Sequence, residues 1–425
     1  MGNLASAVGE RVSATSCWPV GTPCTSPAAH SPRPSIGSAF VACAAPPAPN
    51  PMPTYLLDAR TATNHFPGIG RYTSNLARAL VPLLAADEQL TLLHDPSQPS
   101  RWPLPPANGR VRHLPAPISP FSLAQQWQIP RLIRPLNAAT YHSPYYLMPY
   151  RVGLPTLLTV YDFIPERYPQ YTAPRARLLY RFFHRLALRS AAHVVTISEA
   201  TGHDLLKGYH YPAAQVTTTP LAADPQFVPQ SSAAQTHLRH RYNLPRHFAL
   251  YLGINKPHKN LVRLIEAWAE VYRHMPQPWP LVIAGAWDER YMEPRLTAAR
   301  LGLLGDGILF LGPVAEPDLP ILYSAAELFI FPSLYEGFGL PVIEAMACGT
   351  AVVCAAGSSL PEVAGEAALL FDPHDTVALT AALHRAVNDD PLRAELAQRG
   401  RAQAQKFSWH NTAAATLALY RQLST

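Results

Sequence analysis

The chain has 425 residues, of which 48% are hydrophobic, and its 34 basic and 28 acidic residues give a formal net charge of +6. This length exceeds what a single hydrophobic core usually organises, and the apolar content is sufficient for two cores. The charge is too small to indicate nucleic-acid binding and no RNA- or DNA-binding motif appears, so we expect no nucleic-acid partner.

Residues 1–51 differ in composition from the rest of the chain. They are rich in Pro, Ser and Ala, carry few charges and show neither helical nor strand periodicity. Such segments bury too little apolar surface to offset the entropy of ordering. We therefore interpret residues 1–51 as disordered, or as an extension upstream of a true translation start at Met52.

Strands and helices alternate over residues 52–235. Apolar runs predict strands at 55–58, 157–161 and 194–197, and a helix is expected from 71 to about 84. This alternation predicts a parallel sheet covered by helices. The glycines of Gly68-Ile-Gly70 indicate a loop before that helix, which either approaches a phosphate or is a plain connection.

A second alternating block occupies residues 236–407. It includes an amphipathic segment at 261–273, and its candidate strands lie at 249–252, 281–284, 308–311, 328–331, 351–354 and 368–371. We expect a second doubly wound sheet, whose ligands bind outside the carboxyl ends of its strands. Lys259 and the loop that contains Glu336 should therefore line one edge.

Two glutamates eight positions apart, Glu336 and Glu344, flank a glycine-rich turn that opens a helix. Gly337 and Gly339 allow a tight turn, and Pro341 suits the first turn of a helix because its missing N–H is not needed there. A helix N-terminus favours an anion such as a pyrophosphate. The alternative is that Glu344 complements the helix dipole and Glu336 faces water.

The stretch from Phe331 to Thr350, followed by Ala-Val-Val of the next strand, resembles the E-x7-E signature of the retaining glycosyltransferases of family 4. The resemblance extends to Ser358-Ser-Leu-Pro-Glu362, to the segment 251–261 and to Gly68-Ile-Gly70-Arg-Tyr, and it covers essentially everything from Met52 onward. It implies a GT-B fold, with two Rossmann-like domains facing a central cleft. The implied parts are an N-terminal acceptor-side domain at 52–235, a C-terminal nucleotide-sugar domain at 236–407, and a helix at 408–425 that packs back on the N-terminal domain.

The same resemblance implies a donor site. Glu344 is expected on the ribose hydroxyls, and Lys259 with the helix start Gly339-Leu340-Pro341 on the phosphates, to which Gly70 also comes close. A lysine in this position neutralises the leaving diphosphate, so no metal and no other cofactor is expected. The alternative for Lys259 is an ordinary surface lysine at a helix start.

Glu336 and Asp162 are the expected catalytic residues. Glu336 is implied to position the donor sugar and to stabilise positive charge at its anomeric carbon. Tyr161-Asp162 stands where many relatives have His-Asp; Tyr161 can still donate a hydrogen bond to a sugar, and Asp162 either orients the acceptor or caps a turn. Many relatives carry an Arg just after the glycine at position 253, where the chain has Ile254 and Asn255. Lys256 or His258 is the candidate to replace the positive charge of that Arg.

Two further positions have a structural alternative. Ser198 and Glu199 match a loop that relatives place at the domain interface, which suggests a sugar or acceptor contact for Ser198; an N-cap is equally adequate. Ser359 and Glu362 fit a capping box, so a helix cap is the expectation for Glu362, which relatives hold near the donor site.

The segment Arg177–Arg189 carries arginines at four-residue spacing, with Leu and Phe between them and no acidic residue. It predicts a basic amphipathic helix that contacts an anionic membrane surface; alternatively its apolar face packs on the sheet and the arginines face water. No apolar run reaches the roughly 18 residues of a membrane span, and no Cys-x-x-Cys pair occurs. We expect a cytoplasmic protein, peripheral at the inner face of the membrane.

The sequence thus predicts transfer of a hexose, mannose or glucose, from a GDP- or UDP-linked sugar to a glycan or lipid-linked acceptor in surface polysaccharide synthesis. Its rivals are a nucleotide-sugar 2-epimerase of GT-B fold and a non-catalytic GT-B scaffold.

Overall fold

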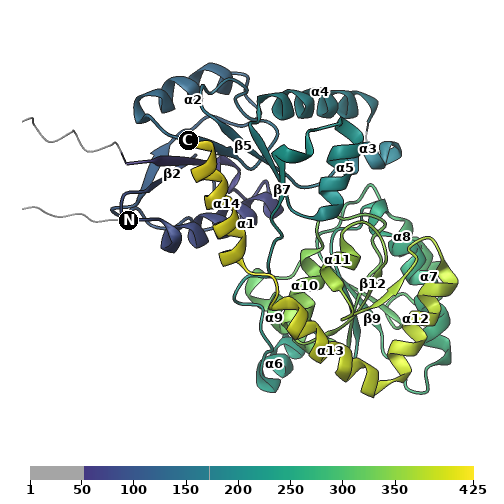
Figure 1. Ribbon diagram of the computed structural model, residues 1–425. Helices are drawn as coiled ribbons and strands as arrows, with labels where there is room; N and C mark the ends of the chain where they lie inside the picture. The colour runs from purple at the N-terminus through teal and green to yellow at the C-terminus, as the bar shows by residue number, and fades with distance from the viewer. Residues whose placement is uncertain (1–51, 172) are drawn as a thin grey trace, which may run out of the picture. The chain divides into compact units, whose positions relative to one another are not determined.

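The computed structural model describes residues 52–171 and 173–425, and the interpretation of residues 1–51 lies outside the described residues. Two parallel β-sheets with helices on both faces make up this part of the chain (Figure 1). The predicted α/β class with two doubly wound sheets is confirmed. None of the helices within the two described ranges combines the length and the hydrophobicity needed to traverse a bilayer.

The first sheet has seven parallel strands in the order β3-β2-β1-β4-β5-β6-β7. The strands are β1 (Thr54–Asp58), β2 (Gln89–His94), β3 (Val111–Pro115), β4 (Thr140–Ser143), β5 (Thr156–Val160), β6 (His193–Thr196) and β7 (Val216–Thr218). The order of the strands reverses between β1 and β4. Sheets of this kind open a crevice for ligands at the carboxyl edge beside such a reversal.

Helices cover both faces of the first sheet, and together they form the first lobe. One face carries α2 (Gln125–Ile133), α4 (Pro174–Ser190) and α5 (Glu199–Tyr209); the short α3 (Ile164–Arg167) follows β5, and α1 (Pro67–Leu80) lies on the other face. Successive side chains of a strand point to opposite faces. Leu56 of β1 accordingly packs with Ile129 of α2, whereas Leu57 packs with Leu76 of α1.

The second sheet has six parallel strands in the order β10-β9-β8-β11-β12-β13. They are β8 (Ala249–Leu252), β9 (Leu281–Ala284), β10 (Ile308–Gly312), β11 (Leu328–Phe331), β12 (Ala351–Ala355) and β13 (Leu369–Phe371). With it, the second lobe contains α6 (Ser232–Tyr242), α7 (Leu261–His274), α8 (Glu293–Arg300), α9 (Leu319–Ala325), α10 (Leu340–Ala347), α11 (Leu360–Ala364), α12 (Thr376–Asn388) and α13 (Asp390–Ala404). The reversal here lies between β8 and β11, the strands that precede Lys259 and Glu336.

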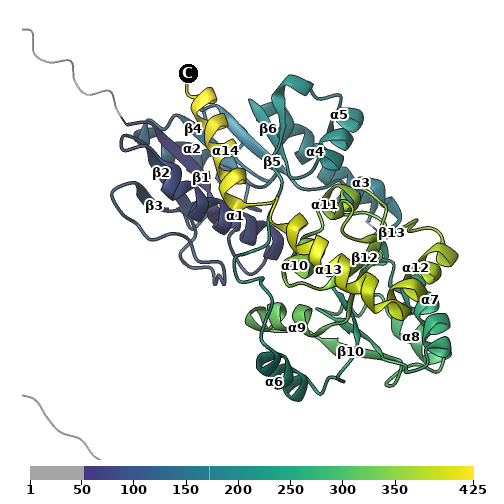
Figure 2. The same ribbon diagram turned by 60° about the horizontal axis from the view of Figure 1, so that its bottom comes forward.

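Helix α14 (Trp409–Leu423) returns to the first lobe and runs beside α1 (Figure 2). Its Tyr420 donates a hydrogen bond to, or accepts one from, Nδ1 of His142 at 2.7 Å. Arg421 makes two hydrogen bonds to Glu88 at 2.7 and 2.8 Å. The helix therefore joins the core that α1 makes with β1 and β2.

The strands predicted in the second lobe are confirmed within one residue, as are those at 55–58, 157–161 and 194–197. The expected loop at Gly68–Gly70 is wrong, because α1 already begins at Pro67 and contains both glycines. Proline fixes φ near its helical value and needs no hydrogen bond at a helix start, so the helix begins four residues earlier than expected. Strands β2, β3, β4 and β7 were not predicted.

Candidate active site

Lys259 and Glu336 meet at the carboxyl edge of the second sheet. Lys259 ends the 3-10 turn Pro257–Lys259 after β8, and Glu336 lies in the loop after β11. Nζ of Lys259 donates to Oε1 of Glu336 at 2.6 Å, and the side chains are 15% and 12% exposed. A cation and a carboxylate are thus fixed side by side in a partly shielded place, where charges act more strongly than in bulk water.

Helix α10 begins directly after the glycine-rich turn. Gly339, its N-cap, has a φ of +111°, a left-handed conformation that other residues rarely adopt. Leu340 and Pro341 form the first turn, and Glu344 follows one turn later. The predicted placement of Glu336 in the loop and Glu344 in the helix is confirmed, and their functional roles stay predictions.

Glu344 is buried and bonded to a side chain from the first lobe. Nη1 of Arg71 in α1 donates to Oε1 of Glu344, and the hydroxyl of Tyr323 donates to Oε2 at 3.0 Å. Arg71 also pairs with Glu316 and, more loosely at 3.7 Å, with Asp224. Three carboxylates therefore share one guanidinium, and Glu344 connects the two lobes.

The three carboxylates are not fully compensated by one cation. Burial, together with the charges of Asp224 and Glu316, raises the pKa of Glu344 to about 7 against the opposing effect of Arg71. Burial also raises the pKa of Asp224. A carboxylate that is costly to keep ionised and lies between two lobes is typical of a functional site. Arg71 was not predicted as a site residue, although Arg71 directly follows Gly70 in the Gly-Ile-Gly-Arg-Tyr motif.

Asp162 lies close to the Lys259–Glu336 pair. It follows β5, and a Cβ placed on Gly337 would lie 3.2 Å from the Cβ of Asp162. Burial raises the pKa of Asp162, nearby Glu336 raises it further, and Lys259 lowers it. Its Oδ1 accepts the N–H of Ile164 at 3.0 Å, which is the turn-capping contact expected as the alternative. One carboxylate oxygen remains without such a contact among the described residues.

Tyr161 touches the glycine-rich turn through its backbone. A side chain at position 337 would collide with its carbonyl oxygen, so only glycine allows this approach between the lobes. The ring stands edge-on to Tyr72 at 5.5 Å between centroids. Its hydroxyl is buried and has no hydrogen-bond partner among the described residues. The Tyr161 hydroxyl is therefore a hydrogen-bond donor without an acceptor among the described residues, and its contact with a sugar stays a prediction.

Ser198 and Glu362 lie at the contact between the lobes. The Ser198 hydroxyl accepts the N–H of Thr201 at 3.0 Å and is the N-cap of α5, so the structural alternative applies and a sugar contact stays a prediction. The capping box expected for Glu362 is wrong: Ser359 makes no cap bond in α11, and Oε2 of Glu362 accepts the N–H of Glu199 at 3.1 Å instead. A helix start from the other lobe replaces the local one as its partner.

Gly70 has a packing role. Its N–H already donates to Phe66 at 2.6 Å, and any side chain at position 70 would collide with the ring of Trp102. Its contact with a donor phosphate stays a prediction, and close packing is a sufficient reason for glycine here.

The structure also places the residues at 254–258, where many relatives carry an arginine that this chain lacks. Nδ2 of Asn255 donates to the carbonyls of Asp288 and Tyr291 at 2.9 and 2.7 Å, which fixes the neighbouring loop. His258 is buried, and burial with the charge of Lys259 lowers its pKa to about 4. It is neutral at physiological pH and supplies no cation, which leaves Lys256 as the candidate substitute. The part of the chain that the structure describes holds no cluster of three His, Cys, Asp or Glu side chains fit for a metal ion.

Comparison with known proteins decides the family. A family model described as glycosyl transferases group 1 matches residues 236–403, and one described as a glycosyl transferase 4-like domain matches residues 67–222. The O-antigen chain mannosyltransferase B of Escherichia coli is 32% identical over 372 residues, which cover 84% of this chain and 96% of that protein. The chain belongs to the group 1 glycosyltransferases of family 4.

Solved structures share the fold of this glycosyltransferase. A sucrose-phosphate synthase from Thermosynechococcus elongatus has a TM-score of 0.65 at 23% identity, covering 88% of this chain and 99% of its own. HepE of Anabaena, in complex with UDP and glucose, has a TM-score of 0.67 at 20% identity, covering 86% and 99%. At such identities the likeness concerns the fold alone, which is the predicted GT-B fold.

Proposed function

We propose that this glycosyltransferase is a retaining hexosyltransferase. It takes mannose or glucose from a GDP- or UDP-linked sugar and transfers it to a glycan or lipid-linked acceptor in surface polysaccharide synthesis, without a metal ion. The identity to an O-antigen chain mannosyltransferase supports the sugar and the pathway. The complex of HepE with UDP and glucose supports a nucleotide-sugar donor.

The observation that carries the proposal is the Lys259–Glu336 ion pair beside Asp162. A diphosphate that enters this edge competes with Glu336 for Lys259, because phosphate oxygens are strong acceptors of charge-assisted hydrogen bonds. Glu336 is then released to face the sugar, where it stabilises positive charge that develops at the anomeric carbon. The N–H groups of Gly339 and Leu340, which have no partner among the described residues, hold other phosphate oxygens at the start of α10. Glu344 accepts hydrogen bonds from the ribose hydroxyls.

The transfer itself balances within the donor and the acceptor. The bond between the anomeric carbon and the diphosphate oxygen breaks, and the acceptor hydroxyl oxygen bonds to the anomeric carbon on the same face. The acceptor proton passes to the departing phosphate oxygen. Lys259 and the α10 N–H groups stabilise the leaving group in place of a metal, and this stabilisation grows as charge develops in the transition state.

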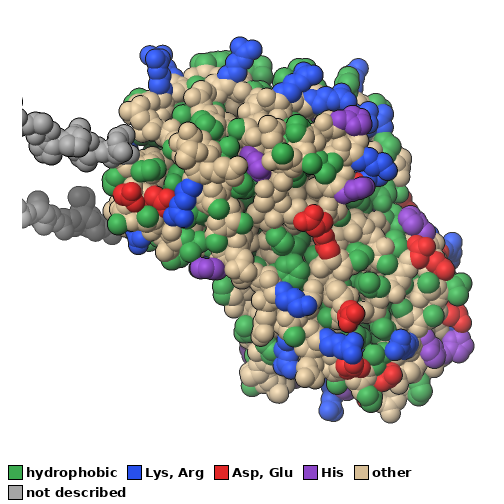
Figure 3. Space-filling model, viewed as in Figure 1, with side chains coloured by type: hydrophobic (Ala, Val, Ile, Leu, Met, Phe, Trp, Pro, Cys, Tyr) green, Lys and Arg blue, Asp and Glu red, His purple; other side chains and the backbone are tan. Residues whose placement is uncertain are grey.

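We also propose that α4 contacts an anionic membrane surface on the cytoplasmic side. Leu178, Leu179 and Phe182 are 70%, 54% and 55% exposed, between the arginines of this helix. Basic side chains stand along the edge formed by α2 and α4 (Figure 3). The segment itself holds no acidic residue, but Arg181 lies 3.6 Å from Glu166 of α3, so one of its arginines has an acidic partner from another helix. An apolar and basic face of this kind favours binding at a lipid interface.

The test is a panel of GDP- and UDP-sugars in thermal unfolding, followed by transfer to an oligosaccharide acceptor with and without EDTA. A donor at 100 times its dissociation constant stabilises the folded protein by about 2.7 kcal/mol. We expect one donor to stabilise the protein in this way. We also expect NMR of the product to show that the anomeric configuration of the donor is retained, and transfer rates to be unchanged in EDTA. Epimerised sugar from donor alone, or no nucleotide binding, would instead indicate the epimerase or the scaffold.

A further inference from the structure

A cavity of about 450 Å³ opens at the carboxyl edge of the first sheet, beside the strand reversal between β1 and β4. Its walls come from the start of α1, the segment after β4, the end of β5 and helix α4. They are mainly aromatic and include Phe66, Tyr145, Tyr146, Tyr161, Tyr180 and His184. Asp162 also lines it, so the cavity lies next to the Lys259–Glu336 pair.

Two buried polar side chains in this wall lack hydrogen-bond partners. Both ring nitrogens of His184 and the hydroxyl of Tyr161 have no partner among the described residues, and His184 is only 2% exposed. Polar groups left unpaired in a protein interior destabilise the fold, so their retention points to a ligand that completes them. Burial lowers the pKa of His184 to about 3. The neutral imidazole offers one donor and one acceptor, which suits a hydroxyl group.

The charge of the wall selects against anionic ligands. No lysine or arginine is among the described residues that line the cavity, and Asp162 contributes a carboxylate. A phosphate group here would meet that carboxylate, while Lys259, outside the lining, is already paired with Glu336. The cavity therefore suits an uncharged molecule with both apolar faces and hydroxyl groups.

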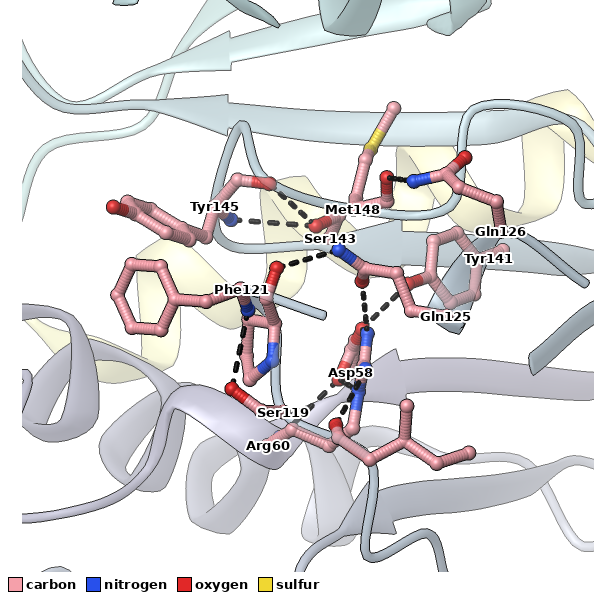
Figure 4. Close-up of polar contacts among 12 residues, drawn as sticks. Asp58, Arg60, Ser119, Phe121, Gln125, Gln126, Tyr141, Ser143, Tyr145 and Met148 are labelled. Carbon is pink, nitrogen blue, oxygen red and sulfur yellow. Dashed lines mark hydrogen bonds and ion pairs between the residues drawn. The ribbon is translucent and has the colours of Figure 1, made fainter. Parts of the chain in front are cut away.

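A buried polar network holds the segment 118–125 beside the cavity (Figure 4). Arg60 donates to both carboxylate oxygens of Asp58 at 2.9 and 2.6 Å, and to the carbonyl of Ile118 at 2.9 Å. Gln125 accepts from Arg60 at 3.1 Å and donates to the carbonyl of Pro120 at 2.5 Å. The segment 118–125 is thereby tied to the end of β1.

That segment carries Phe121, which is 56% exposed. Its ring stacks on that of Phe66 with 5.7 Å between centroids, and the rings of Phe66 and Tyr145 have centroids 5.1 Å apart. The hydroxyl of Ser143, at the end of β4, donates to the carbonyl of Tyr145 at 2.7 Å. An exposed aromatic rim held by buried polar contacts is preorganised for binding, because few side chains must be ordered when the ligand arrives.

We propose that this cavity holds the terminal sugar of the acceptor as an uncharged hexose ring, and that it excludes phosphorylated acceptors. The assignment rests on the proposed transferase function. The aromatic rim covers the apolar face of the ring, and Tyr161 and His184 hydrogen-bond to its hydroxyls. Another hydroxyl faces Asp162 and, beyond it, Glu336.

The test measures sugar binding without any nucleotide. The full chain is titrated with methyl α-D-mannopyranoside and with mannose 6-phosphate, followed by saturation-transfer NMR. We expect the neutral glycoside to bind and the phosphate to bind at least tenfold more weakly. Tighter binding of mannose 6-phosphate, or no binding of the glycoside, would overturn the assignment.

Two variants separate a ligand role from a structural one. His184→Phe and Tyr161→Phe keep the aromatic ring and remove polar atoms that have no partner in the free protein. We expect both to unfold at the wild-type temperature or above it, yet to bind the glycoside about tenfold more weakly, as the loss of one hydrogen bond predicts. The control Trp127→Phe alters an aromatic residue that is 61% exposed and outside the cavity. Wild-type affinity in both cavity variants would refute the assignment.

A parallel thermal-unfolding measurement with nucleotide sugars keeps the two proposals distinguishable. Stabilisation by a nucleotide sugar without glycoside binding refutes only the cavity assignment. Glycoside binding without stabilisation by any nucleotide sugar supports a sugar site and refutes its role as the acceptor site of a transferase.

Discussion

Glu344→Gln is expected to stabilise the protein at high pH while it weakens donor binding. The buried carboxyl has its pKa raised from 4.5 to about 7, so the folded state holds the proton more tightly than the unfolded chain. The stability that this provides is present below pH 4.5 and is lost as the pH rises through about 7. That step corresponds to about 3 kcal/mol at 1.36 kcal/mol per pKa unit.

Glutamine resembles the protonated carboxyl: its oxygen can accept from Arg71, and its amide N–H can donate to the hydroxyl of Tyr323. Arg71 also retains Glu316 and Asp224 as partners, so the substitution leaves no buried cation unpaired. We therefore expect the variant to be more stable than wild type by about 3 kcal/mol at pH 8 and by less than about 1 kcal/mol at pH 5. Calorimetric titration with nucleoside diphosphates should show weaker binding, since a neutral amide accepts ribose hydroxyls less strongly.

Denaturant unfolding at both pH values checks the stability, with Glu366→Gln as control. Glu366 is an exposed glutamate of the same lobe, and its substitution should change stability by less than about 0.5 kcal/mol. A Glu344→Gln variant less stable than wild type at pH 8, or a difference that does not depend on pH, would refute the reasoning.

Four other perturbations test the Lys259–Glu336 pair, the glycine-rich turn and helix α4. Lys259→Ala should lower turnover by a factor of about 10²–10³ and weaken nucleotide binding, whereas Glu336→Ala should mainly lower turnover. Wild-type rates in both variants would refute the assignment of these residues to the active site. Gly337→Ala should lower activity tenfold or more because its side chain collides with Tyr161, while Gly208→Ala, which meets no atom within 4 Å, should not. A variant with Gln in place of Arg177, Arg181 and Arg185 should no longer co-sediment with anionic vesicles, because each arginine adds about 1 kcal/mol to the binding free energy. Unchanged sedimentation would contradict the membrane proposal.

The elements that could be predicted are those whose buried residues are apolar. Strands β8, β9 and β11 read as continuous apolar runs because both faces of a parallel sheet are covered. Strand β4, Thr-Tyr-His-Ser, is equally buried, and its polar side chains gave no such signal. Nε2 of His142 lies 2.7 Å from the hydroxyl of Thr159, and Nδ1 lies 2.7 Å from that of Tyr420. Partners this distant in sequence leave no local pattern.

The site shows the same limit. The glycine-rich turn located Glu336 and Glu344 relative to α10, because turn and helix-start chemistry is local. The arginine that pairs with Glu344 is 273 positions away, and the backbone N–H that bonds to Glu362 is 163 positions away. The capping-box interpretation failed for this reason. The local motif is present, but Glu362 accepts a backbone N–H from the first lobe instead of one from its own helix.

The return of α14 to the first lobe affects the order in which the lobes can finish folding during synthesis. Leu417 and Tyr420 belong to the core under α1, so this core stays incomplete until α14 leaves the ribosome. At about 5–20 residues per second, synthesis from Thr218 to Leu423 takes on the order of 10–40 s. The second lobe can form meanwhile, and the lobe that begins first in the sequence is completed last.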